Sequence, residues 1–154
     1  SFRKLWPGKL VIKGIMHPED ARRALELGVD GILVSNHGGR QLDRAPAALE
    51  AFPAIKAAVG NRAVLMLDSG VRRGADILVA LALGAHFVFV GRATLYGAVV
   101  GGTAGVSKAI GILQHEIELN LKQCGCPSLD RLGSDCLFPV AAETARAVSE
   151  LAAD

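Results

Sequence analysis

A histidine and an arginine stand three residues apart directly after an apolar run. The run is Ile-Leu-Val at residues 32–34, and Ser-Asn-His-Gly-Gly-Arg follows it, which places an imidazole at His37 and a guanidinium at Arg40. An imidazole can accept a proton near neutral pH, and a guanidinium can bind a carboxylate through two parallel hydrogen bonds. The spacing therefore indicates a base beside an anion clamp, which is the outline of an enzyme that acts on a small acid.

Three further apolar runs in the chain also end in a charged residue, at Lys13, Asp68 and Arg92. Parallel strands bring their carboxyl ends to one edge of a sheet, and barrel enzymes carry their chemistry at that edge. An isolated strand-end lysine is usually a surface residue whose aliphatic part lies along apolar neighbours, and an isolated histidine is usually structural. Because these residues occur together, we expect Lys13, His37 and Arg92 to face one common site.

Arg72 and Arg92 follow the last two of these runs, with glycines nearby at Gly70, Gly74 and Gly91. Glycines let backbone N–H groups approach an anion closely. If the two runs are the last strands of an eight-stranded barrel, both arginines lie where such barrels bind phosphate. The alternative is a pair of solvated arginines, but the convergence of two strand ends favours the phosphate site.

Several polar residues are instead expected to have structural roles. Arg73 is expected to face solvent, and Asp43 to fix the loop after the histidine motif. His17 stands where a helix begins, while His86 and His115 show no pattern of partners.

Short apolar runs alternate with amphipathic stretches along the chain, which is the pattern of serial βα units. The runs are apolar throughout, so the strands are expected to be parallel and covered on both faces. Leu-Gly-Val-Asp-Gly-Ile-Leu-Val at residues 27–34 is echoed by Leu-Gly-Ala-His-Phe-Val-Phe-Val at 83–90. We expect strands at residues 10–14, 30–36, 63–68 and 87–90. We expect one helix that begins near His17 and three more helices at 49–59, 75–83 and 105–122.

Four βα units fit two architectures, a small open doubly wound sheet or half of a (βα)8 barrel, which normally takes about 250 residues. Charged residues at successive strand ends favour the half-barrel, which leaves two open sheet edges and an uncovered core and should need a partner. We expect a leading segment at 1–8, four βα units at 9–104, and C-terminal helices and a tail at 105–154.

Composition narrows the class of protein further. The chain has 154 residues, and 51% of them are hydrophobic. Its net charge is only +2, and its Lys and Arg residues are scattered, which argues against a nucleic-acid partner. Three cysteines without a secretory segment indicate reduced thiols inside the cell, and Cys124-Gly-Cys126 has no second ligand cluster, so no metal is expected. The charge-free runs 77–91 and 93–107 fall short of the roughly 18–20 residues of a membrane span, so a cytoplasmic protein is expected.

Four motifs together resemble the FMN-dependent α-hydroxy acid dehydrogenases and oxidases, a family that includes glycolate oxidase, flavocytochrome-type lactate dehydrogenases and mandelate dehydrogenase. The resemblance covers about residues 9–138. Its motifs are Val-Ile-Lys-Gly at 11–14, Leu-Val-Ser-Asn-His-Gly-Gly-Arg-Gln-Leu-Asp at 33–43, Asp-Ser-Gly-Val-Arg-Arg-Gly at 68–74 and Phe-Val-Gly-Arg at 89–92. Gly-Arg-Ala-Thr-Leu-Tyr-Gly at 91–97, Gly-Cys-Pro at 125–127, and Ser69, where many members have Gly, look most like the (S)-mandelate dehydrogenase branch.

The resemblance implies a (βα)8 fold of which this chain is the C-terminal half, strands five to eight. It implies that His37 is the base at the substrate's α-carbon, that Arg40 binds the substrate carboxylate, and that Lys13 lies near the N1/O2 edge of the flavin. Ser35 would also contact the flavin. The other FMN-binding residues that it implies are Asp68, Ser69, Gly70, Val71, Arg72, Gly91 and Arg92.

The family's N-terminal half supplies strands one to four, tyrosines near the substrate and an Asp that orients the catalytic His. The resemblance therefore implies oxidation of an (S)-2-hydroxy acid, mandelate- or lactate-like, by this chain together with a complementary N-terminal half or chain, and no activity without it. The complete enzyme would be a homo-oligomer, as members are often tetramers, and a membrane anchor in a segment outside this chain stays open. Two alternatives remain at this point, a non-catalytic FMN- or phosphate-binding half-barrel and another phosphate-binding barrel enzyme.

Overall fold

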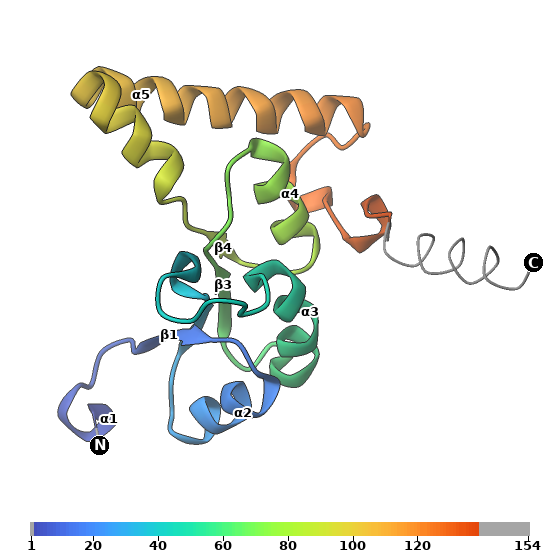
Figure 1. Cartoon of the computed structure of the whole chain (residues 1–154). Helices are drawn as coiled ribbons and strands as arrows, with labels where there is room; N and C mark the ends of the chain where they lie inside the picture. Colours follow the sequence, from blue (N-terminus) through green and yellow to red (C-terminus); the bar gives the residue numbers. More distant parts are fainter. Residues whose placement is uncertain (1, 139–154) are drawn as a thin grey trace, which may run out of the picture.

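Four parallel strands form one sheet in which each strand pairs with the next one in sequence (Figure 1). The computed structural model describes residues 2–138, and the strands are β1 (Val11–Ile15), β2 (Gly31–Val34), β3 (Val64–Leu67) and β4 (Phe87–Val88). A doubly wound sheet reverses its strand order at a switch point, whereas a barrel continues in sequence. The order β1-β2-β3-β4 therefore confirms half of a barrel and excludes the doubly wound alternative.

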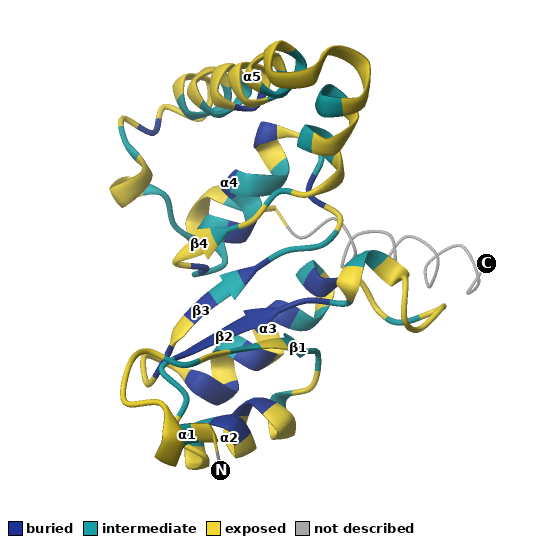
Figure 2. Ribbon diagram, turned by 90° about the vertical axis from the view of Figure 1, so that its left-hand side faces the viewer, coloured by how far each residue is buried: buried dark blue, intermediate teal, exposed yellow. Residues whose placement is uncertain are grey.

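The main hydrophobic core lies between the sheet and the helices that connect its strands. The connecting helices are α2 (Pro18–Glu26), α3 (Ala48–Val59) and α4 (Gly74–Ala82). Alternate strand residues point toward them, and Ile32, Val34, Leu65 and Leu67 are at most 1% exposed. Phe52 of α3 is fully buried against the same cluster. Figure 2 shows the buried residues concentrated in β2, β3 and the helix surfaces behind them.

The other residues of each strand lie on the opposite, inner face of the sheet, and much of that face is exposed. Val11 and Val64 lie in register on either side of Gly31, and Phe87 pairs with Met66 on the same face. Val11, Val64 and Phe87 are 47–56% exposed, and Phe89 beyond β4 is 43% exposed. Aliphatic and aromatic side chains at interior barrel positions normally fill the barrel core. Gly31 and Leu33 of β2 are nevertheless buried on this face, so within residues 2–138 the expectation that the strands are covered on both faces holds for β2 and is wrong for the other three strands.

The longest helix is α5 (Arg92–Gln123), which starts earlier than the expected helix at 105–122 and bends sharply (Figure 1). The backbone leaves the helical conformation at Gly101 and Gly102, which divides α5 into two arms. The arms approach closely, since a Cβ atom on Gly97 would lie 2.5 Å from the carbonyl oxygen of Gly105. The first arm was missed because its glycines weaken the helical pattern, and its large apolar side chains are mostly exposed.

The second arm of α5 packs on the start of α4. Glu116 accepts the N–H of Gly74 at 2.7 Å and forms an ion pair with Arg73 at 2.8 Å. By length and composition α5 is the one helix in the described part of the chain that could cross a membrane. No residue of its most apolar 18-residue window is buried, and Leu113 is the one buried residue of the helix within the described chain.

The segment before β1 is tied to the amino end of the sheet. It contains one helical turn that the sequence did not predict, α1 (Phe2–Leu5). Arg3 and Lys9 both pair with Asp30 at 2.9 Å, and the N–H of Leu10 donates to the same carboxylate. The bond from the Leu10 N–H, followed by those from Lys9 and Arg3, holds the pKa of Asp30 far below its ordinary value.

Short turns complete the described chain. His17 accepts the N–H of Glu19 at the start of α2, which confirms its role as a helix-start residue. Three 3-10 turns are present: η1 (His37–Gly39), η2 (Leu129–Arg131) and η3 (Ser134–Cys136). Of the C-terminal helices and tail expected at 105–154, residues 139–154 lie outside the described residues.

Candidate active site

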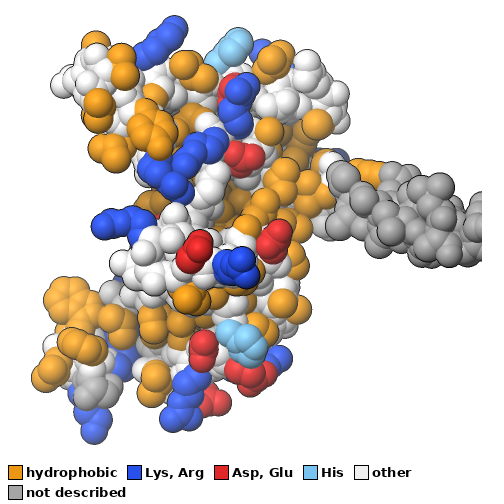
Figure 3. Space-filling model, in the orientation of Figure 1, with side chains coloured by type: hydrophobic (Ala, Val, Ile, Leu, Met, Phe, Trp, Pro, Cys, Tyr) orange, Lys and Arg blue, Asp and Glu red, His pale blue; other side chains and the backbone are white. Residues whose placement is uncertain are grey.

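A pocket of about 830 Å³ opens at the carboxyl ends of the four strands. This volume is in the range of small-molecule and cofactor sites. In the space-filling view, Lys and Arg side chains border a hollow on the left-hand side of the molecule (Figure 3). The pocket is lined by Lys13, Leu33, His37, Gly38, Arg40, Gln41, Asp68, Ser69, Gly70, Val71, Arg72, Phe89, Val90, Gly91, Arg92 and Leu95.

His37 lies in a loop whose backbone is under strain. Its φ is 55°, and Gly38 and Gly39 follow with φ of 71° and 76°, so three successive residues adopt the left-handed conformation. The imidazole packs over Gly14 of β1, where a Cβ atom would lie only 2.7 Å from Nε2. Within residues 2–138 no side chain hydrogen-bonds the ring, so nothing in this part of the chain fixes its tautomer.

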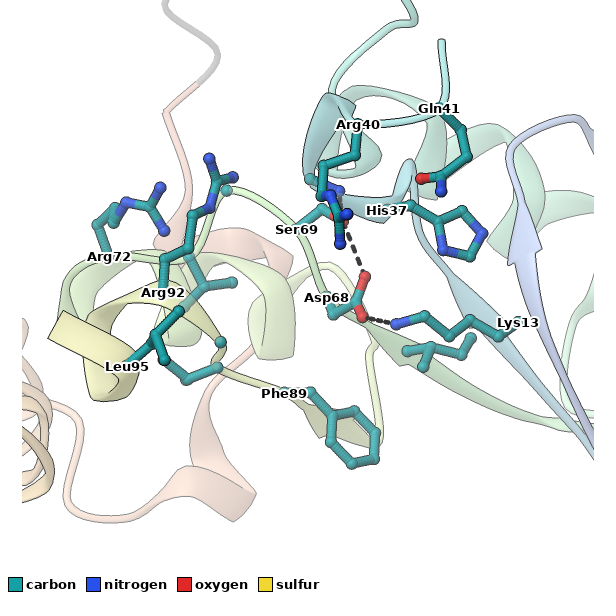
Figure 4. A pocket seen from close by; sticks show the side chains of 16 residues that line it. Lys13, His37, Arg40, Gln41, Asp68, Ser69, Arg72, Phe89, Arg92 and Leu95 are labelled. Atoms are coloured by element: carbon teal, nitrogen blue, oxygen red, sulfur yellow. Dashed lines mark hydrogen bonds and ion pairs between the residues drawn. The ribbon is translucent and has the colours of Figure 1, made fainter. Parts of the chain in front are cut away.

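Arg40 follows the same loop and lies on the pocket wall beside His37 and Gln41 (Figure 4). Its guanidinium forms no ion pair with any described residue, and the Arg40 residue is exposed. The charge is therefore available to a ligand that carries a carboxylate.

Lys13 and Asp68 face each other across the floor of the pocket and form an ion pair (Figure 4). Burial raises the pKa of Asp68, but hydrogen bonds from Lys13, Ser35 and Ser69 outweigh it, so the pKa lies below the ordinary value. The pair brings together two of the predicted strand-end residues, and each of them borders the pocket.

Arg72 and Arg92 lie side by side at the end of the pocket away from Lys13 (Figure 4), and the Arg92 guanidinium reaches Gly38, where a Cβ atom would lie 3.2 Å from it. Neither guanidinium pairs with an acidic side chain in the described chain. The amino end of α5 also opens here, and the N–H groups of Arg92 and Ala93 have no backbone acceptor within residues 2–138. Two cations and a helix amino end form a setting that suits a phosphate.

Arg73 and Gly74 do not take part in this anion site. Arg73 points to the outside of the domain and pairs with Glu116, which confirms that it is the outward member of the two neighbouring arginines. The sequence-based expectation for Gly74 is wrong, because its N–H donates to the Glu116 carboxylate outside the pocket and does not face a phosphate in the pocket. A Cβ atom there would lie 2.7 Å from the backbone nitrogen of Ile117, so glycine permits the close contact between α4 and α5.

Comparison with known proteins shows which family shares this arrangement. Residues 1–139 match the FMN-dependent dehydrogenase family. The chain belongs to this family. It is 50% identical to an L-lactate oxidase of Nostoc sp. over 88% of this chain and 37% of that protein. It is 46% identical to a pre-mycofactocin synthase of Mycobacterium tuberculosis over 90% of this chain and 35% of that protein. The crystal structure of the monotopic membrane protein (S)-mandelate dehydrogenase matches with a TM-score of 0.84 and 46% identity, over 89% of this chain and 36% of that one.

These FMN-dependent dehydrogenases are longer than this chain, which spans about a third of the length of the curated relatives that it matches. The match to the (S)-mandelate dehydrogenase structure agrees with the half-barrel, since it covers most of this chain and only part of that one. The phosphate-binding barrel enzyme of another family is excluded by the family match.

FMN, the cofactor of this family, fits the residues that border the pocket. The unpaired arginines and the amino end of α5 can bind the phosphate, and Leu33 and Phe89 add apolar surface to the pocket lining. The sequence did not point to Leu33, Phe89, Leu95 or Gln41. For Leu33 and Phe89 the signal was the alternation of strand residues, which identifies the inner face only once the strands are placed. Gln41 follows η1 and Leu95 lies in α5, where no such alternation applies.

Ser35, which the resemblance assigns to flavin contact, does not border the pocket. It is 1% exposed, and its hydroxyl accepts the N–H of His37 at 3.1 Å. Contact of Ser35 with a flavin stays a prediction, while its contact with the histidine loop is present in this chain.

Proposed function

We propose that this chain carries the base, the carboxylate clamp and the FMN phosphate site of an enzyme that oxidises an (S)-2-hydroxy acid to the 2-oxo acid. The observation that carries the proposal is the shared pocket, which His37 and Arg40 enter from one strand end and Arg72 and Arg92 from two others. A mandelate- or lactate-like acid suits a clamp for one carboxylate beside a single base.

His37 and Arg40 have complementary tasks in this reaction. The guanidinium of Arg40 binds the substrate carboxylate through two hydrogen bonds and orients the α-carbon toward the imidazole. It also offsets the negative charge of the carboxylate, which otherwise opposes removal of the α-hydrogen. The imidazole of His37 accepts the proton that leaves the substrate, whether from the α-carbon or from the hydroxyl group.

The remaining pocket residues are assigned to FMN. Bound oxidised FMN supplies the acceptor for the two electrons of the reaction. Arg72, Arg92 and Gly91 would hold its phosphate, with Gly70 and Val71 along the chain that leads to it. Lys13, Asp68 and Ser69 would lie nearer the ring system, where the Lys13 ammonium favours negative charge. The buried Ser35 hydroxyl supports the histidine loop by accepting the N–H of His37.

We further propose that activity requires a complementary N-terminal half of the barrel. Two features support this requirement, the exposed apolar inner face of the sheet and the absence of a hydrogen-bond partner for the His37 ring in residues 2–138. A carboxylate from the other half would fix the imidazole tautomer. The complete enzyme would be a cytoplasmic homo-oligomer, a tetramer by analogy with other members, and any membrane attachment would come through a segment outside this chain.

The test uses what we call the assembled enzyme, this chain combined with the N-terminal four βα units of the similar (S)-mandelate dehydrogenase. Anaerobic bleaching of the flavin absorbance by (S)-mandelate, L-lactate and glycolate measures the reaction and identifies the substrate. We expect bleaching by at least one of these acids, a loss of at least about 100-fold in His37→Ala, and a KM about 10–100-fold higher in Arg40→Ala.

His115→Ala is the matched control, because His115 lies on α5 outside the pocket and should leave bleaching unchanged. The pre-mycofactocin synthase match at 46% identity makes the substrate panel necessary, since relatives at this level bear different activity names. An assembled enzyme that binds FMN but is bleached by none of these acids would overturn the proposal in favour of the non-catalytic alternative.

A further inference from the structure

Ser69 adopts a backbone conformation that disfavours a side chain. Its φ is 76°, in the left-handed region that favours glycine. Among the described residues other than glycine, only His37 and Arg44 share a positive φ. A side chain that persists at such a φ is held by its surroundings, and the strain points to a task for that side chain.

The Ser69 hydroxyl connects the end of β3 to the loop that carries the histidine. It donates to Asp68 Oδ1 at 2.8 Å and accepts the N–H of Gly38 at 3.1 Å. It also lies 3.3 Å from the hydroxyl of Ser35, which accepts the N–H of His37 at 3.1 Å. A hydroxyl has one proton to donate and two lone pairs, so donation to the carboxylate leaves the oxygen free to accept from the loop.

The histidine loop needs such support, because residues 37–39 are all in the left-handed conformation. Its other hydrogen-bond acceptors come from the end of the same strand, where Asn36 Oδ1 accepts the Gly38 N–H at 3.0 Å and Ser35 accepts that of His37. Ser69 is the acceptor that comes from a neighbouring strand. It therefore sets the position of the loop relative to β3, which the contacts within the loop cannot do.

We propose that Ser69 is a positioning residue for the reaction, whose hydroxyl holds the backbone of His37 and Gly38 in place against Asp68 and its partner Lys13. The imidazole follows its own backbone, so a loop that moves relative to β3 misplaces the base. The effect on turnover rests on the proposed function, but the hydrogen bonds to the loop do not. This task adds to any contact of Ser69 with a cofactor, since Ser69 also borders the pocket.

Ser69→Gly is the informative substitution, because glycine accepts a φ of 76° without strain and only the hydroxymethyl group is lost. Arg44→Gly is the matched control, since Arg44 has a φ of 61°, is exposed and lies outside the pocket lining. Both substitutions relax the backbone, but only the first removes the link to the histidine loop. A comparison of the two variants therefore separates backbone relief from the loss of the hydroxyl.

The first readout is the rate of amide hydrogen exchange at His37 and Gly38, which NMR measures in this chain alone. We expect exchange at these two amides to be about tenfold faster in Ser69→Gly and unchanged in Arg44→Gly. The second readout is turnover of a 2-hydroxy acid by the assembled enzyme, where we expect kcat to fall about tenfold with KM within about twofold of the wild-type value. A purely structural role would move stability without this split between kcat and KM.

Unchanged exchange at His37 and Gly38 in Ser69→Gly would overturn the inference whatever the activity. An unchanged kcat in a variant with faster exchange would also overturn it, because the contact would then have no bearing on the base. If neither the wild type nor the variant oxidises a hydroxy acid while exchange still rises at these amides, the proposed function fails and the contact to the loop is supported.

Discussion

Arg72 and Arg73 are neighbours in the sequence that point to opposite sides of the domain. Arg72 borders the pocket, while Arg73 pairs with Glu116 on the outside. The two therefore form a natural comparison for the phosphate site, because either substitution removes one positive charge from the same loop.

We predict that Arg72→Ala in the assembled enzyme weakens FMN binding about 10–100-fold, the range for a lost hydrogen bond between charged groups. Riboflavin has no phosphate, so its affinity should stay nearly unchanged, and Arg73→Ala should leave both ligands unaffected. Quenching of flavin fluorescence measures each Kd. Equal losses for FMN and riboflavin, or an equal loss in Arg73→Ala, would contradict the assignment.

The Lys13–Asp68 pair predicts how stability depends on pH. The pKa of Asp68 is lowered in the folded chain, so its ionised form contributes stability that is complete above the unfolded pKa of about 3.9 and is lost as pH falls toward the folded value. The difference in unfolding free energy between wild type and Asp68→Asn should be about 1–2 kcal/mol at pH 7 and shrink below about pH 4.

Urea unfolding of the chain at pH 7, 5, 4 and 3 measures this difference. Asp43→Asn is the control, because Asp43 is an exposed loop residue and no hydrogen bond to its carboxylate is present in the described chain. A difference that grows as the pH falls, or one that Asp43→Asn reproduces, would show that the pair does not stabilise the fold.

At the scale of single residues, the sequence predicted the charged site residues and missed the hydroxyl network. A Lys, Asp or Arg after an apolar run is unusual enough to stand out, and the βα pattern brings the ends of such runs together. The link between Ser69 and Gly38 depends on the register of β2 against β3 and on a positive φ, and neither can be read from residue types. Gln41 and Phe89 in the pocket lining were also missed, because their residue types do not show that the loop after η1 and the end of β4 meet at the pocket.

At the scale of elements, the packing of α5 on α4 depends on one glycine. Gly74 opens α4, and a Cβ atom there would meet Glu116 and the backbone of Ile117 at 2.6–2.9 Å. We predict that Gly74→Ala lowers the unfolding free energy by about 1–3 kcal/mol, as overpacking does. Gly111→Ala, where a Cβ atom has open space in the same α5, should raise it by about 0.5–1 kcal/mol.

Urea unfolding of both variants gives these two values under the same conditions. Equal effects of the two substitutions would show that α5 does not pack closely on α4. The helices themselves were predicted to within a few residues wherever an apolar period was clear, as in α3. Their contacts were not, because a glycine in the sequence is consistent with a turn, an anion site or a close helix contact, and only the packing decides among them.

At the scale of the whole molecule, the chain is a sheet with one covered face. Its apolar inner residues and the unpaired outer edges of β1 and β4 describe a barrel surface that lacks its other half within residues 2–138. The sequence predicted this incompleteness from the number of βα units, because four units cannot close a barrel of eight. Which face would be exposed followed only from the strand order and the register.

The most direct test of the account compares this chain alone with the assembled enzyme, in FMN content and in anaerobic flavin bleaching by a 2-hydroxy acid. We predict that the chain alone neither retains stoichiometric FMN nor oxidises the acid, whereas the assembled enzyme does both and loses the oxidation in His37→Ala. Stoichiometric FMN with hydroxy acid turnover by the chain alone would contradict the account.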